Sequence, residues 1–204
     1  MSGLILKDLL TLKKQAKLFA VLLIVYCAIS CFTDMYMMSS VFVFVGGMLP
    51  ITALAYDERA HWDRICLTLP VSRTQIVLSK YALGVLLSAA GTVIYLLMLI
   101  IGERGFSAIT ENLVVAAGMF LAAMLMLSLS MPLLFWLGSE KFRLIFLLLF
   151  LLPVLLISTF GDTELPALTP QQELWIAIGF TAGVLTLLAL SMALSAAIIH
   201  RKEY

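Results

Sequence analysis

Residues 56–81, YDERAHWDRICLTLPVSRTQIVLSKY, form a polar segment that lies between two long apolar blocks. The segment contains one histidine, His61, and seven fixed charges, which are Asp57, Glu58, Arg59, Asp63, Arg64, Arg73 and Lys80. The whole chain has only 13 basic and 12 acidic residues, and the sequence on both sides of the segment is apolar enough to lie in lipid. We therefore expect the polar segment to meet a soluble partner, and it is the first place to look for function.

The composition of the chain excludes an ordinary soluble domain. Of its 204 residues, 63% are hydrophobic and 12% are charged, and its mean hydropathy is +1.10. A soluble domain carries about 25% charged residues. The chain is therefore expected to be an all-α membrane protein, with one transmembrane domain over residues 1–204. No A-x-A-like site follows the first apolar block, so we expect that block to remain as a span.

Six apolar blocks are long enough to be membrane spans, because a helix needs roughly 20 apolar residues to cross a bilayer core. The blocks cover about residues 18–36, 39–56, 79–102, 112–137, 142–160 and 174–199. The boundary between the first two blocks stays open, since only Asp34 and the run MYMMSS mark a turn there. The expected fold has six transmembrane helices.

Lys and Arg residues predict the orientation, because cytoplasmic connections carry the excess of them. With the N-terminus in the cytoplasm, 12 of the 13 basic residues lie inside and only Arg104 lies outside. The expected outer connections are acidic and contain Asp34, Glu103, Glu111, Asp162, Glu164 and Glu173. We therefore expect both termini and the polar segment in the cytoplasm.

The N-terminal residues 1–17 precede the first apolar block and include the amphipathic stretch GLILKDLLTLKKQAK, residues 3–17. Helical spacing places Ile5, Leu9, Leu12 and Ala16 on one face, and Lys7 and Lys14 on another. Such a helix can lie in the cytoplasmic interface before the chain enters the first span. The alternative is that it only extends the first span into the cytosol.

The polar segment can itself form a short helix over residues 57–69. One face would carry Trp62, Ile65, Cys66 and Leu69, and the opposite face Asp57, His61, Arg64 and Thr68. Pro70 would end this helix, and Ser72 could cap the helix that leads into the third span. The alternative, equally open on physical grounds, is a solvated loop whose arginines only fix the topology.

The polar segment resembles the first cytoplasmic loop of short type-2 ABC-transporter permeases. The motifs that carry the resemblance are Tyr56-Asp57-Glu58, Trp62-Asp63, Leu69-Pro70, Ser72-Arg73 and Val77 with Lys80-Tyr81, together with the opening GLILKDLLTLKKQ. The chain is similar to the permeases of phenol-soluble-modulin exporters, and this resemblance implies a location in a bacterial cytoplasmic membrane. The resemblance implies a homodimer or heterodimer of permeases and two separate ATPase subunits that bind ATP and Mg.

The resemblance also implies a coupling segment over residues 57–76 that docks into the ATPase. The residues expected to contact the ATPase are Asp57, Glu58, His61, Trp62, Asp63, Arg64, Leu69, Pro70 and Arg73. No substrate motif of the family can be matched here, so the substrate-binding residues are unknown.

Motifs for chemistry on this chain itself are missing. The sequence has no G-x-x-x-x-G-K-[ST] to hold nucleotide phosphates and no H-E-x-x-H, and its only histidines are His61 and His200. Cys27, Cys31 and Cys66 are interpreted as packing residues, since no ligand set surrounds them. We expect no catalytic, metal or cofactor site, no nucleic-acid partner, and no ion coupling, because the span centres lack ionisable residues.

Small residues in the last block raise the question of a helix contact. Gly179 and Gly183 form a G-x-x-x-G motif, and Ser191 and Ser195 continue the spacing. Small residues let helices approach closely. A dimer contact and packing within one chain both fit the motif, and packing is favoured.

Two classes of function remain. The first is an export permease, driven by ATP hydrolysis on partner chains, that moves a hydrophobic or amphipathic peptide, a substrate that only the resemblance suggests. The second is a membrane anchor or immunity subunit that recruits a soluble partner through the same loop without transport. An enzyme is disfavoured because catalytic groups are missing.

Overall fold

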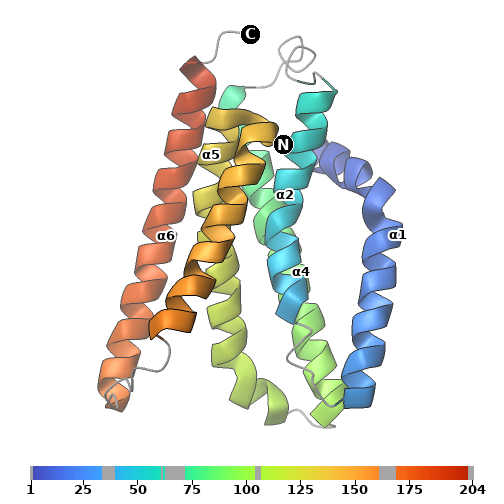
Figure 1. Ribbon diagram of the computed structural model, residues 1–204, viewed down its shortest axis with the longest axis vertical. Helices are drawn as coiled ribbons and strands as arrows, with labels where there is room; N and C mark the ends of the chain where they lie inside the picture. Colours follow the sequence, from blue (N-terminus) through green and yellow to red (C-terminus); the bar gives the residue numbers. More distant parts are fainter. Residues whose placement is uncertain are drawn as a thin grey trace.

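The computed structural model describes residues 2–33, 40–60, 62, 72–103, 107–160 and 169–201, and nearly all of them are helical. The helices are α1 (Ser2–Thr33), α2 (Val41–Arg59), α4 (Arg73–Glu103), α5 (Ser107–Phe160) and α6 (Pro170–Arg201) (Figure 1). Helix α2 packs against α4 and α5, α6 packs against α5, and α1 packs against α2 and α4. The all-α prediction is confirmed for these ranges.

Helix α5 consists of two helices that join at Gly138, where φ is 78°. A positive φ favours glycine, because a side chain there would crowd the backbone. Figure 1 shows that the chain reverses direction at this point. We call residues 107–137 the first half of α5 and residues 139–160 its second half. The reversal falls between the fourth and fifth predicted blocks.

Helices α2 and α4 cross at two glycines. A Cβ atom on Gly46 would collide with the backbone carbonyl of Leu87, and one on Gly91 with that of Phe42. The backbones therefore touch without intervening side chains. This close approach fixes the position of α2, and with it the place where the polar segment begins.

The core between α4, α5 and α6 is apolar but contains one polar link. The hydroxyl of Tyr81 lies 2.6 Å from that of Ser191 and 3.0 Å from that of Ser195, and Ser191 donates to the carbonyl of Ser128. The two serines thus pack within the chain. A Cβ atom on Gly179 or Gly183 would meet none of the described residues within 4 Å, so among them the G-x-x-x-G motif makes no such contact.

Helix α1 is continuous from Ser2 to Thr33. In Figure 1 its first turns run across the end of the bundle, and the helix then bends to run along it. Of the predicted apolar face, Leu12 is buried and Ile5 half-buried, Leu9 is 43% exposed, and the side chain of Ala16 lies outside the described residues; Asp8 is buried as well. The placement of the first turns in a membrane interface stays a prediction.

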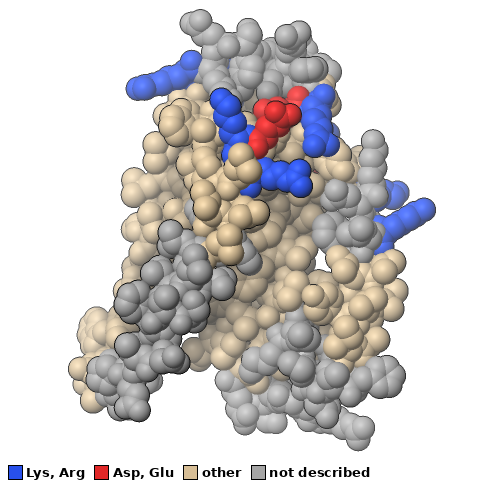
Figure 2. All heavy atoms as spheres, in the orientation of Figure 1, with Lys and Arg blue, Asp and Glu red and all other residues tan. Residues whose placement is uncertain are grey.

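Among the described residues, four helical stretches are long and apolar enough to cross a membrane, namely Val41–Arg59, Arg73–Ile100, Asn112–Leu148 and Leu174–Arg201. Large apolar side chains such as Val114, Trp136 and Leu144 are exposed on them, as expected for surfaces that lipid covers. In Figure 2 the charged side chains that are coloured, those of the described residues, lie in the upper half of the view, at the end of the bundle where α2 ends and α4 begins. The six-span count and the orientation stay predictions.

Candidate functional site

Four charged side chains from three helices meet at the charged end of the bundle. Lys80 Nζ of α4 lies 2.7 Å from Asp8 Oδ1 of α1 and 2.6 Å from Asp57 Oδ2 of α2. Lys7 Nζ lies 2.6 Å from Asp57 Oδ1 and 2.9 Å from Asp8 Oδ1. We call these four residues the charge tetrad. Asp57 and Lys80 flank the middle of the polar segment, so the tetrad closes the base of that segment and ties it to α1.

The tetrad is buried and balanced in charge. The side chain of Asp8 is 1% exposed and that of Lys80 is 2% exposed, whereas Lys7 reaches the surface. Two lysines and two aspartates leave no net charge. Balance matters because an unpaired charge in a protein interior costs several kcal/mol. Each member therefore depends on the others being present and charged.

Trp62, in the polar segment, extends the tetrad through a contact with Lys7. Lys7 Nζ lies 4.5 Å from the centre of the Trp62 ring. A cation over an aromatic face is attracted by the ring's quadrupole, by about 0.5–2 kcal/mol depending on exposure. Lys7 thus contacts both acidic members of the tetrad and the indole.

Glu58 connects α2 to the reversal in α5. One Glu58 carboxylate oxygen, Oε2, accepts a hydrogen bond of 2.7 Å from the backbone N–H of Ser139, and the other lies 2.7 Å from the position a Cβ atom on Gly138 would take. A carboxylate at the first turn of a helix satisfies a free N–H group and favourably meets the helix dipole. The end of α2 is therefore fastened to the start of the second half of α5.

Arg73 connects the other side of the polar segment to α6. Its guanidinium donates to the carbonyls of Ile199 and His200, at 3.0 and 3.2 Å, where the last carbonyls of α6 lack helical partners. Ser72 Oγ accepts a hydrogen bond from the N–H of Gln75 at 3.3 Å, so the predicted cap of this helix is confirmed.

The helix predicted over residues 57–69 needs a correction at its start. Asp57, Glu58 and Arg59 form the last turn of α2, which ends at the capping residue Ala60, and α4 already begins at Arg73. A helix starting at Asp57 was therefore wrong, and the part between the helices is residues 60–72. The end of α2 is held by contacts with α1 and α5, and the start of α4 is held by a contact with α6.

The structure places four of the nine predicted ATPase-contact residues in this region. Asp57, Glu58 and Arg73 bond to other helices, and Trp62 lies against Lys7. The remaining predicted residues, His61, Asp63, Arg64, Leu69 and Pro70, lie outside the described residues. Contact with an ATPase stays a prediction for all nine.

Sequence reasoning missed Asp8, Lys7 and Lys80 as parts of one site. The lysines were interpreted only as markers of topology. The sequence did contain one signal, which is the presence of two acidic residues, Asp8 and Asp57, near span ends on the side that is rich in Lys and Arg. Buried charges there require partners. No group of three or more metal-ligating residues occurs among the described residues.

The length of the match to known proteins decides the family. A model described as ABC-2 family transporter protein matches residues 3–200, nearly the whole chain. The chain belongs to the ABC-2 transporter family. Membrane proteins of the ABC-2 family lie in a lipid bilayer and generally work with an ATPase subunit. Comparisons with curated proteins and with solved structures gave no match.

In this ABC-2 family protein, the charge tetrad lies where it can connect the polar segment to other helices. The connection it closes is the most polar part of the chain, and its ends are bonded to α1, α5 and α6. A displacement of that connection would thus reach three other helices through charged contacts.

Proposed function

We propose that this ABC-2 protein is the permease subunit of an ATP-driven exporter, in which the polar segment receives motion from a separate ATPase and the charge tetrad passes it to α1. The observation that carries the proposal is the tetrad itself. Asp57 and Lys80, on the two sides of residues 60–72, bond to each other, and each also bonds to one residue of α1, Asp57 to Lys7 and Lys80 to Asp8.

The buried ion pairs make the base of the polar segment stiff. Charges attract more strongly in a low-dielectric interior than in water, so separating Asp57 from Lys80 without a replacement partner is costly. A push on residues 61–71 therefore moves the ends of α2 and α4 together. Lys7 and Asp8 follow because Lys7 is paired with Asp57 and Asp8 is paired with Lys80.

Two further contacts distribute the motion. Glu58 holds the first N–H of the second half of α5, and Arg73 holds the last carbonyls of α6. Transport by alternating access requires helices that move relative to one another. These two contacts connect the polar segment to the second half of α5 and to α6. In this account His61, Asp63, Arg64, Leu69 and Pro70 meet the ATPase surface.

The division of labour follows from what the sequence lacks. The chain has no phosphate-binding motif, so ATP and Mg bind to the partner ATPase. The working unit contains a second permease, identical or different. It lies in the cytoplasmic membrane of a bacterium, with both termini in the cytoplasm, as the Lys and Arg distribution favours.

The proposed substrate is a hydrophobic or amphipathic peptide, and the resemblance to phenol-soluble-modulin exporters supports this choice. The test is a complex of this chain with its ATPase in lipid vesicles. An amphipathic helical peptide should raise ATP turnover and accumulate across the membrane. A scrambled peptide of the same composition, without an apolar face, is the matched control.

The same experiment separates transport from anchoring. A non-transporting anchor would bind the ATPase, yet no peptide would raise turnover or cross the membrane. That outcome would contradict the exporter proposal and favour an anchor or immunity subunit.

A further inference from the structure

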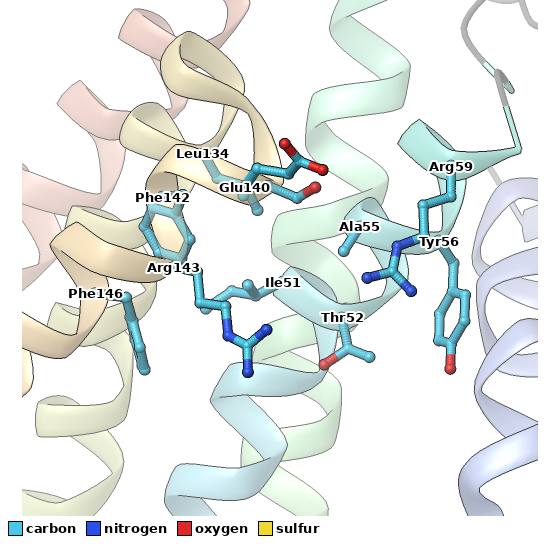
Figure 3. Close-up of a pocket in the computed structure, with 11 residues that line it drawn as sticks. Ile51, Thr52, Ala55, Tyr56, Arg59, Leu134, Glu140, Phe142, Arg143 and Phe146 are labelled. Carbon is cyan, nitrogen blue, oxygen red and sulfur yellow. The ribbon is translucent and has the colours of Figure 1, made fainter.

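A cleft of about 740 Å³ lies between α2 and α5, beside the charge tetrad but separate from it. Its walls carry Ile51, Thr52, Ala55, Tyr56 and Arg59 from α2, and Leu134, Ser139, Glu140, Phe142, Arg143 and Phe146 from α5. Figure 3 shows Arg59 and Arg143 entering from opposite walls, with both guanidinium groups directed into the space between the helices.

The positive charges that line the cleft are only partly compensated. Arg59 and Arg143 are exposed and, among the residues that the structure describes, neither forms an ion pair or hydrogen bond. Of the described residues that line the cleft, Glu140 is the one carboxylate, which leaves one net positive charge on its walls. The coupling contacts do not use these arginines. The cleft therefore favours an anionic occupant.

The cleft is lined by both cationic and apolar side chains. Arg59 lies in the last turn of α2, and Ile51 lies about two turns before it on the same helix. On α5, Phe146 lies about one turn beyond Arg143. A molecule with an anionic head and an apolar body can use both kinds of lining.

We propose that this cleft binds an anionic phospholipid, whose phosphate is held between Arg59 and Arg143 and whose acyl chains lie along the second half of α5. The planar guanidinium group can donate two parallel hydrogen bonds to phosphate, which an ammonium group cannot. Basic pockets between helices on the cytoplasmic side of membrane proteins bind such headgroups. Leu144, Leu147 and Leu148 continue the exposed apolar surface beyond the cleft.

A lipid fits better than free phosphate or an acidic peptide. Free phosphate would use the arginines but would leave the apolar surface of Ile51 and of the exposed Leu144, Leu147 and Leu148 uncovered. An acidic peptide would bring polar backbone against that apolar surface, where unsatisfied N–H and C=O groups are costly.

The test counts phosphatidylglycerol and phosphatidylcholine bound to the purified full chain by native mass spectrometry, at a salt concentration that screens surface charge. Arg59→Gln and Arg143→Gln should each weaken phosphatidylglycerol binding roughly tenfold, since a hydrogen bond to a charged group is worth about 1.5–3 kcal/mol. Arg143→Lys should keep part of the affinity. Phosphatidylcholine binding should not change.

Two further variants separate a site from general attraction. Lys141→Gln removes the same charge from the same helix, but Lys141 does not line the cleft, and its effect should stay within about twofold because surface charges are screened. Glu140→Gln removes the opposing carboxylate and should strengthen binding by about fivefold. An increase in affinity cannot come from a misfolded protein.

Several outcomes would overturn the proposal. One is an equal loss in Lys141→Gln and Arg143→Gln, because it would show attraction to the surface as a whole. A second is binding of inorganic phosphate with the same dependence on arginine but no retention of phosphatidylglycerol. A third is displacement of the lipid by an acidic peptide at equal concentration.

Discussion

The charge tetrad predicts strong coupling between Asp8 and Lys80. Lys80→Gln leaves Asp8 and Asp57 with only Lys7 to balance them, and Asp8→Asn leaves two lysines with one aspartate. Each single substitution therefore creates a net buried charge. The double variant Asp8→Asn/Lys80→Gln keeps the Lys7–Asp57 pair and restores neutrality.

The magnitude follows from the geometry. At the 2.7 Å that separates Asp8 Oδ1 from Lys80 Nζ, the attraction is about 6 kcal/mol for an effective dielectric constant of about 20, before the cost of desolvation. Removing one partner of a buried pair costs about 3–5 kcal/mol, most of it from the charge left behind. We expect each single variant to lose about that much. The double variant should lose no more than either single one, so the coupling energy is about 3 kcal/mol.

The assay is the free energy of unfolding of the purified chain in mixed micelles, followed by tryptophan fluorescence as denaturing detergent is added. Lys13→Gln is the matched control, since Lys13 lies on the same helix as Asp8 but is exposed, and its effect should stay within about 0.5 kcal/mol. Losses that simply add in the double variant would refute the reasoning, because they would mean that the two side chains act independently.

Three further predictions concern packing and use the same unfolding assay. Gly91→Ala should lower the free energy of unfolding by about 1–3 kcal/mol, because the new Cβ atom meets the backbone of α2. Gly179→Ala is the control: its Cβ atom meets none of the described residues, so this variant should be neutral or stabilising by up to about 1 kcal/mol. Equal effects of the two variants would contradict the packing of α2 on α4. Gly138→Ala should cost about 1–2 kcal/mol because of the positive φ, and an unchanged stability would mean that α5 reverses differently. Tyr81→Phe should cost about 1 kcal/mol by leaving two serine hydroxyls without their shared partner, and no loss would show that this polar link contributes nothing.

Local sequence patterns predicted the helical elements well. Apolar blocks separated by short polar connections predicted helices in the right places, the α5 reversal fell where two blocks were divided, and Ser72 was a recognisable cap. Each of these features depends on residues close together in the sequence. The exact ends of α2 and α4 were harder, since they are set by contacts with other helices.

The tetrad could not be predicted in the same way. Lys7 and Asp57 are 50 residues apart, and Asp8 and Lys80 are 72 apart, so no local pattern joins them. On α1 a pattern of apolar residues cannot single out Asp8, which is buried together with Leu12. A charged residue is buried only where another helix supplies its partner, and that partner is visible only in three dimensions.

The most direct test of the central claim is the amount of peptide moved per ATP hydrolysed by the reconstituted complex. The double variant Asp8→Asn/Lys80→Gln suits this test because it removes the link between α1 and α4 without leaving a net buried charge, and Lys13→Gln again serves as the control. We predict that the double variant still binds the ATPase and still hydrolyses ATP, while the peptide moved per ATP falls well below that of the control. An unchanged ratio would contradict the claim that the tetrad passes motion from the polar segment to α1.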